Sequence, residues 1–79
     1  MKIPRDISGI SLAKKLEKLG CSITRQTGSH IRLTTQQSGE HHLTIPRHDP
    51  LKIGTLSSVL NAVAEHFDRT KEDIIKGIF

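Results

Sequence analysis

Apolar positions recur at helical spacing near the start of the chain. Leucines stand at every third or fourth position after residue 8, namely Leu12, Leu16 and Leu19. Positions three and four apart share one face of a helix, so this pattern predicts an amphipathic helix. Ser8 or Ser11 can cap its start and Gly20 suits its end. The preceding residues 1–7 form a short arm, held stiff at Pro4.

Two further helices are predicted in the last third of the chain. A second helix is predicted from near-ideal spacing of five apolar residues, Leu56, Val59, Leu60, Val63 and Phe67. Two starts fit it: Asp49 as the cap with Pro50 in the first helical position, or a start near Gly54 and Thr55. Thr70 and Asp73 resemble a capping box, which predicts a short last helix with Ile74, Ile75 and Ile78 inward.

Between the helical segments, apolar and polar residues alternate. Three strands are predicted, over residues 21–26, 29–35 and 40–46. Successive side chains of a strand point to opposite faces, so Ile31 and Leu33 share one face, as do Leu43 and Ile45. The other face is polar and carries His30, Arg32, Thr34, His42 and Thr44. An antiparallel sheet with one packed and one solvent-exposed face fits this pattern.

The order of elements predicts the fold class. It is α-β-β-β-α with a short C-terminal helix, an α+β domain with a three-stranded antiparallel sheet and helices on one face. The segment 46–50 connects the last strand to the second helix. We expect a single domain over residues 1–79, because a chain of 79 residues has room for one small core and a surface site. It has no room for a large buried cofactor.

Charge indicates the kind of partner. Twelve Lys and Arg against eight Asp and Glu leave a formal charge of +4, with a pI near 9.7. Residues 1–60 hold nine basic and four acidic side chains, and residues 61–79 hold three and four. A basic body suits a polyanion, although charge alone fits equally well a basic domain without such a partner. No apolar stretch could span a bilayer, no secretory signal is recognisable and Cys21 is the sole cysteine, so we expect a cytoplasmic protein.

Most catalytic arrangements can be set aside. The chain has no Walker-type loop and no dinucleotide-binding glycine motif. Its histidines lack metal-ligand spacing, and His41 and His42 should point to opposite faces, so neither a metal nor another cofactor is expected. Cys21 opens a strand, where a lone cysteine is usually a small core residue.

The remaining candidate is the tripeptide Gly28-Ser29-His30. Gly28 permits a tight turn, Ser29 supplies a hydroxyl, and His30 would emerge on the polar face. A histidine can take up and return a proton near neutral pH. Arg32 points the same way and could hold a phosphate or stabilise developing negative charge. Three residues alone are a weak motif, and an exposed strand histidine without a role fits them too.

A family resemblance adds support. The chain resembles the HicA toxins of toxin–antitoxin pairs, also called YcfA-like mRNA interferases. Residues 12–20 (LAKKLEKLG) resemble the family's first helix, Gly28-Ser29-His30 its catalytic strand motif, and residues 45–60 (IPRHDPLKIGTLSSVL) its most recognisable segment. The motifs occur in the family's order and spacing over nearly the whole chain. Residues 61–79 extend beyond the pattern.

The resemblance implies a double-stranded-RNA-binding-like fold, ribosome-independent mRNA cleavage and neutralisation by a HicB-like antitoxin. The family's catalytic histidine corresponds to His30. The ribose 2′-hydroxyl would attack the adjacent phosphate with His30 as general base or acid, without a metal. Candidate RNA contacts are Gly28 and Ser29 together with the cationic side chains of Lys14, Lys15, Lys18, Arg25, Arg32, Arg47 and Lys52.

Two other functions remain open. The same fold could be a non-catalytic RNA-binding module, although a chain without Trp or Tyr offers no platform for stacking bases. Residues 55–78 could form a DNA-binding helix-turn-helix, but this is the more acidic end of the chain.

Overall fold

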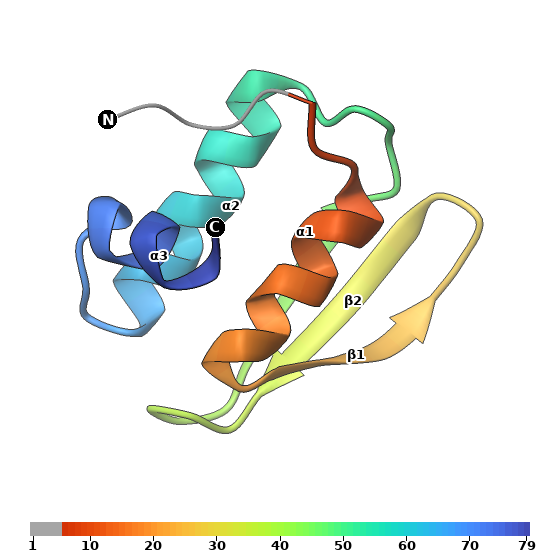
Figure 1. Cartoon of the computed structure of the whole chain (residues 1–79). Coiled ribbons are helices and arrows are strands. Elements are labelled where there is room, and N and C mark those ends of the chain that lie inside the picture. The colour runs from red at the N-terminus through yellow and green to blue at the C-terminus, as the bar shows by residue number, and fades with distance from the viewer. Residues whose placement is uncertain (1–5) are drawn as a thin grey trace.

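The computed structural model describes residues 6–79. The elements in chain order are α1 (Gly9–Leu16), the 3-10 helix η1 (Glu17–Leu19), β1 (Cys21–Gln26), β2 (His30–Thr35), β3 (His41–Pro46), α2 (Ile53–His66) and α3 (Lys71–Ile78). The strands form one antiparallel sheet in the order β1-β2-β3, with the helices on one side of it (Figure 1). This is the predicted α+β fold. Pro4, the expected stiff point of the arm, lies outside the described residues.

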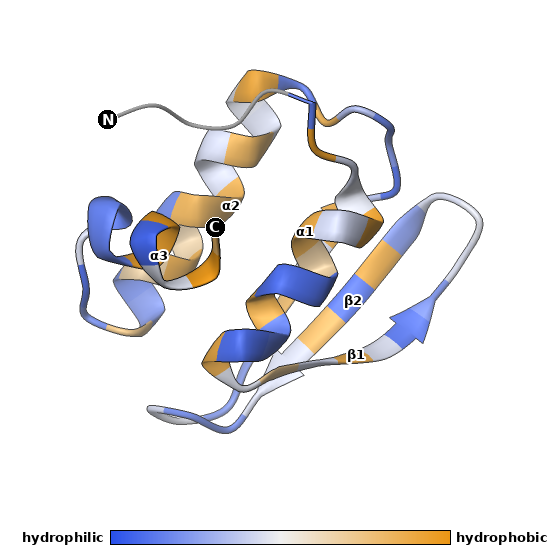
Figure 2. Ribbon diagram, in the orientation of Figure 1, coloured by the Kyte–Doolittle hydropathy of each residue, from blue (hydrophilic) through white to orange (hydrophobic). Residues whose placement is uncertain are grey.

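The core lies between the helices and the sheet, and it includes buried residues of α1, α2 and α3. Leu12 and Leu16 of α1 are fully buried, as are Ile31 and Leu33 of β2 and Ile45 of β3. The alternation along β2 is visible as bands of contrasting hydropathy, and the polar side of α1 faces away from the sheet (Figure 2). The predicted division into a packed and an exposed sheet face is confirmed, with Leu43 half-buried at its margin. Within residues 6–79, no helix is long and apolar enough to cross a membrane.

The first helix begins and ends on the residues that favour these positions. Ser8 is its N-cap, and the Ser8 hydroxyl accepts a hydrogen bond from the Ser11 amide at 3.1 Å. The last predicted turn tightens into η1, so Leu19 lies in a 3-10 helix rather than in α1. Gly20 follows with φ of 91°, a left-handed conformation that glycine adopts at little cost.

The start of α1 lies against the end of β3. The Gly9 amide donates to the His48 carbonyl at 2.9 Å. A Cβ at Gly9 would lie 2.1 Å from the Pro46 carbonyl oxygen, so only glycine permits this approach. The contact fixes α1 relative to the segment that follows β3.

The start of α2 agrees with one of the two predicted positions and excludes the other. The helix begins at Ile53 with Lys52 as N-cap, close to the start expected near Gly54. A start at Asp49 and Pro50 is wrong because Leu51 is buried and its amide bonds the Ile7 carbonyl at 2.8 Å, outside any helix. In α3 the Thr70 hydroxyl accepts from the Asp73 amide at 3.1 Å, which confirms the predicted cap. The inward residues Ile74, Ile75 and Ile78 are buried as expected.

Strand β1 carries an irregularity that the sequence pattern did not indicate. Ile23 pairs with Leu33, but the next paired residue of β1 is Arg25, which lies opposite Arg32. Thr24 is therefore an extra residue, a β-bulge, and such a bulge re-aims the side chains beyond it. Simple alternation would place Arg25 on the packed face with Ile23. The bulge turns Arg25 to the exposed face.

Candidate active site

The loop between β1 and β2 is held by its own threonine. Thr27 donates its amide to the His30 carbonyl at 2.9 Å, and its hydroxyl oxygen accepts from the His30 amide at 3.0 Å. The Ser29 amide also points to this oxygen, at 3.4 Å. Threonine commonly closes short turns by such local bonds. Sequence reasoning missed this role of Thr27, although a threonine directly before Gly-Ser between two strands was a signal for such a turn.

Strand β2 begins at His30, one residue later than predicted, and the His30 side chain is exposed. Its ring nitrogen Nδ1 lies 2.9 Å from the Ser29 hydroxyl oxygen. A partner on Nδ1 orients an imidazole and leaves Nε2 for chemistry. No group within residues 6–79 bonds that second nitrogen. The arrangement suits proton transfer to or from a molecule lying on the sheet.

Gly28 has a different role from the one expected of it. The glycines with positive φ within the described part of the chain are Gly20 and Gly39, so the turn itself does not require glycine at position 28. A Cβ there would meet no atom within 4 Å. The absence of a side chain at Gly28 therefore leaves open space beside Ser29 and His30.

Three arginines lie at the same end of the sheet. Arg25 of β1 and Arg32 of β2 are direct cross-strand partners on the exposed face. Arg32 follows His30 by two positions along β2. Arg47 follows β3; its amide donates to the Ser29 carbonyl at 2.8 Å, and its Nη1 donates to the Thr27 carbonyl at 3.3 Å. The structure thus gathers six predicted site residues, Arg25, Gly28, Ser29, His30, Arg32 and Arg47.

The Arg25–Arg32 pair is electrostatically unfavourable by itself. Like charges directly opposite each other on neighbouring strands destabilise a sheet. No carboxylate of residues 6–79 forms an ion pair with either guanidinium, because the pairs found there join Glu40 to His42 and Glu72 to Lys76. An anion bound between the two arginines would relieve the repulsion.

The predicted lysines lie elsewhere. Lys14, Lys15 and Lys18 belong to the helical layer, away from the exposed sheet face, and the Lys15 Nζ stands 5.3 Å from the centre of the Phe79 ring. Lys52 is the N-cap residue of α2. The structure does not bring these four side chains to His30.

The remaining histidines and the cysteine have distinct surroundings. His41 turns to the helical side, as expected, and stacks on His66 of α2 with ring centres 4.3 Å apart. Burial raises the pKa of the Cys21 thiol, and a hydrogen bond with Thr35 partly opposes this shift. A buried thiol is a poor nucleophile, in agreement with the core position predicted for Cys21. The described residues contain no group of three or more His, Cys, Asp or Glu side chains suited to hold a metal ion.

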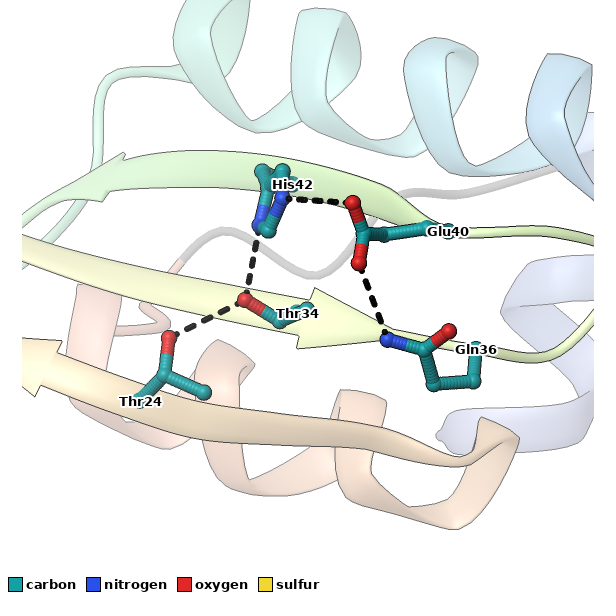
Figure 3. Close-up of polar contacts among 5 residues, drawn as sticks. All are labelled: Thr24, Thr34, Gln36, Glu40 and His42. Carbon is teal, nitrogen blue, oxygen red and sulfur yellow. Dashed lines mark hydrogen bonds and ion pairs between the residues drawn. The ribbon is translucent and has the colours of Figure 1, made fainter.

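A chain of polar contacts crosses the other end of the exposed face (Figure 3). The Thr24 and Thr34 hydroxyl oxygens lie 3.1 Å apart, and Thr34 Oγ1 lies 2.8 Å from His42 Nδ1. His42 Nε2 is 3.6 Å from Glu40 Oε2, and Gln36 Nε2 donates to Glu40 Oε1 at 3.3 Å. His42 was expected on this face, whereas the roles of Thr24, Gln36 and Glu40 were not foreseen.

Comparison with known proteins decides the family. The family model described as the HicA toxin of bacterial toxin–antitoxin systems matches residues 11–63. The chain belongs to the HicA toxin family. No curated protein and no solved structure matches it significantly.

Membership in the HicA family makes this chain the toxin of a toxin–antitoxin system and implies an antitoxin partner. The matched span contains the three strands and most of α2, and therefore His30 and all three arginines beside it. Helix α3 lies beyond the match.

Proposed function

We propose that this HicA-family chain is an endoribonuclease that cleaves mRNA independently of the ribosome, with His30 as its catalytic residue. The observation that carries the proposal is the position of His30 beside the Arg25–Arg32 pair on an open sheet face. A proton-transfer group and unpaired cations at one place are what cleavage of a phosphodiester requires. An mRNA target places the activity in the cytoplasm.

RNA supplies its own nucleophile. The ribose 2′-oxygen forms a bond to the neighbouring phosphorus, and the bond from phosphorus to the 5′-oxygen breaks. His30 takes the proton from the 2′-hydroxyl as a base or gives one to the departing 5′-oxygen as an acid. The arginines stabilise the negative charge that builds up on the phosphate oxygens. This reaction needs no metal ion, and DNA is not a substrate because it lacks the 2′-hydroxyl.

Substitution of His30 tests the proposal. His30→Ala should keep the melting temperature, because the side chain is exposed, and should lose RNA cleavage by about a hundredfold or more, the usual contribution of an acid–base group. Cleavage is measured on purified protein in excess EDTA, which silences contaminating metal-dependent nucleases. His42→Ala is the matched histidine variant and should retain much more activity than His30→Ala.

Two results would contradict the proposal. A folded His30→Ala protein with wild-type cleavage would remove His30 from the mechanism. A wild-type protein that binds RNA at low salt without cutting it would be a non-catalytic RNA-binding module.

A further inference from the structure

The exposed sheet face is ordered in rows from basic to acidic. His30 lies opposite Pro46 in the first row, and Arg25, Arg32 and Thr44 form the second. Thr34 and His42 form the third row, beyond which Gln36 and Glu40 meet. Since a strand rises about 3.3 Å per residue, the third row lies roughly 13 Å from His30. A strand of RNA whose phosphates contact the arginines would extend over His42 and Glu40.

The hydrogen bonds of the third row hold His42 in place. The Thr24 hydroxyl oxygen lies 3.4 Å from the Arg32 carbonyl oxygen and 3.1 Å from the Thr34 hydroxyl oxygen. Thr34 Oγ1 in turn lies 2.8 Å from His42 Nδ1, so this contact occupies Nδ1 and leaves Nε2 on the side of Glu40.

The Glu40 carboxylate is open to a ligand on this surface. Its Oε2 lies 3.6 Å from His42 Nε2, within ion-pair distance but longer than a hydrogen bond, and the His42 and Glu40 side chains are 43% and 63% exposed. Gln36 holds the other carboxylate oxygen in place at 3.3 Å. A ligand group that donates hydrogen bonds would bind this exposed acceptor.

Nucleobases differ in this property. Adenine, cytosine and guanine each carry an exocyclic amino group with two donor hydrogens, and carboxylates accept from such amino groups. Uracil has no amino group and presents carbonyl oxygens, which a carboxylate repels. With no Trp or Tyr in the chain, recognition of bases on this face has to rely on hydrogen bonds more than on stacking.

We infer that Glu40 and His42 form a base-recognition site that selects an amino-bearing base over uracil, a few nucleotides from the cleaved bond. The inference rests on the proposed ribonuclease function. Glu40 and His42 select the sequence, and they do not take part in the bond-breaking step at His30. Thr24, Thr34 and Gln36 are positioning residues that hold the pair.

The test is a comparison of cleavage patterns on a randomised RNA pool, with the cut ends sequenced. Glu40→Gln replaces an acceptor oxygen by an amide donor and should weaken the preference for amino-bearing bases over uracil at one flanking position by about fivefold or more. His42→Ala should weaken the same preference. Glu17→Gln removes an exposed carboxylate from η1, in the helical layer, and should leave the pattern unchanged.

Binding provides a second measurement that does not depend on catalysis. In a His30→Ala background, short RNAs with an amino-bearing base at that position should bind more tightly than the uracil version. Glu40→Gln should abolish the difference. Melting temperatures establish that each variant is folded.

The outcomes separate the two proposals. A wild-type protein that cuts no RNA overturns the proposed function and this inference with it. Wild-type cleavage with the same base preference in Glu40→Gln and His42→Ala overturns this inference alone. An equal loss of cleavage rate at every RNA sequence also overturns this inference, because it indicates a merely structural role of the pair. A loss of antitoxin affinity with an unchanged cleavage pattern overturns it too, because it assigns the pair to a protein interface.

Discussion

Gly28 stands beside the candidate catalytic histidine without a backbone reason for being glycine. Its φ is not in the left-handed region, and a methyl group at this position would point into open space. The neighbouring Ser29 and His30 are exposed and bonded to each other. Under the proposed function, an RNA backbone would approach His30 through this open space at Gly28.

Gly28→Ala tests this role of the open space. The variant should fold with unchanged stability or gain less than about 1 kcal/mol, because alanine restricts the unfolded chain. Its RNA cleavage should fall by about tenfold or more, since displacing a substrate by a fraction of an ångström to 1 Å is costly. Urea denaturation and the cleavage assay measure the two effects. Gly77→Ala, in α3, is the matched glycine variant and should cleave normally; a fully active Gly28→Ala protein would contradict the assignment.

At the scale of elements, the contact between α1 and the end of β3 positions the site. Gly9 lies against Pro46 and bonds His48, while Arg47 between them bonds Ser29 and Thr27 in the loop that carries His30. The start of α1, the end of β3 and the loop before His30 are thus joined through one short segment.

Gly9→Ala should disrupt this junction. Its Cβ would approach a backbone oxygen to 2.1 Å, and backbone cannot rotate away as a side chain can. We expect a loss of unfolding free energy of about 1–3 kcal/mol, typical of overpacking. Gly54→Ala, inside α2 with no atom within 4 Å of the added Cβ, should be neutral or slightly stabilising. Equal stability of the two variants in urea denaturation would show that α1 does not depend on this close approach.

Local patterns predicted the elements well, and non-local pairing accounts for what they missed. Spacing of apolar residues located α1 and α2, and the capping box at Thr70 located α3. Alternation assigned His30 and Arg32 to the exposed face. The side of Arg25 could not be predicted, because it depends on the bulge at Thr24, which exists only in the pairing of β1 with β2.

In the candidate site, too, local patterns predicted some positions and missed those that depend on contacts distant in sequence. His42 could be placed from alternation alone, but its partner Glu40 lies outside the strand. Glu40 reaches its position because the turn after β2 reverses through Ser38 and Gly39, both at positive φ. Arg47 joins the loop at Thr27 across a distance in sequence that no local pattern spans.

The whole molecule divides into a helical layer and an open sheet face, with different charges available on each. Arg25, Arg32 and Arg47 lie around His30 at one end of the sheet, whereas Lys14 and Lys15 lie on α1 in the other layer. The described residues place no helix over the exposed face (Figure 1). The His30 side chain is exposed to solvent. An antitoxin that silences the site directly has to cover this face.

The last prediction follows from that geometry. We expect the antitoxin, of the HicB type, to bury His30 and to pair carboxylates with Arg25, Arg32 or Arg47, because complementary charges steer and align such interfaces. NMR titration of the His30 ring should show its solvent accessibility lost in the complex, and association should slow as salt rises. Acetylation of Lys14, on the helical layer, should proceed as in the free toxin and serves as the control. If His30 keeps its free titration behaviour in the inhibited complex while Lys14 is protected, the antitoxin binds the helical layer. Inhibition would then have to be transmitted through the core to the loop at Thr27, which a domain with so few independent parts is poorly built to do.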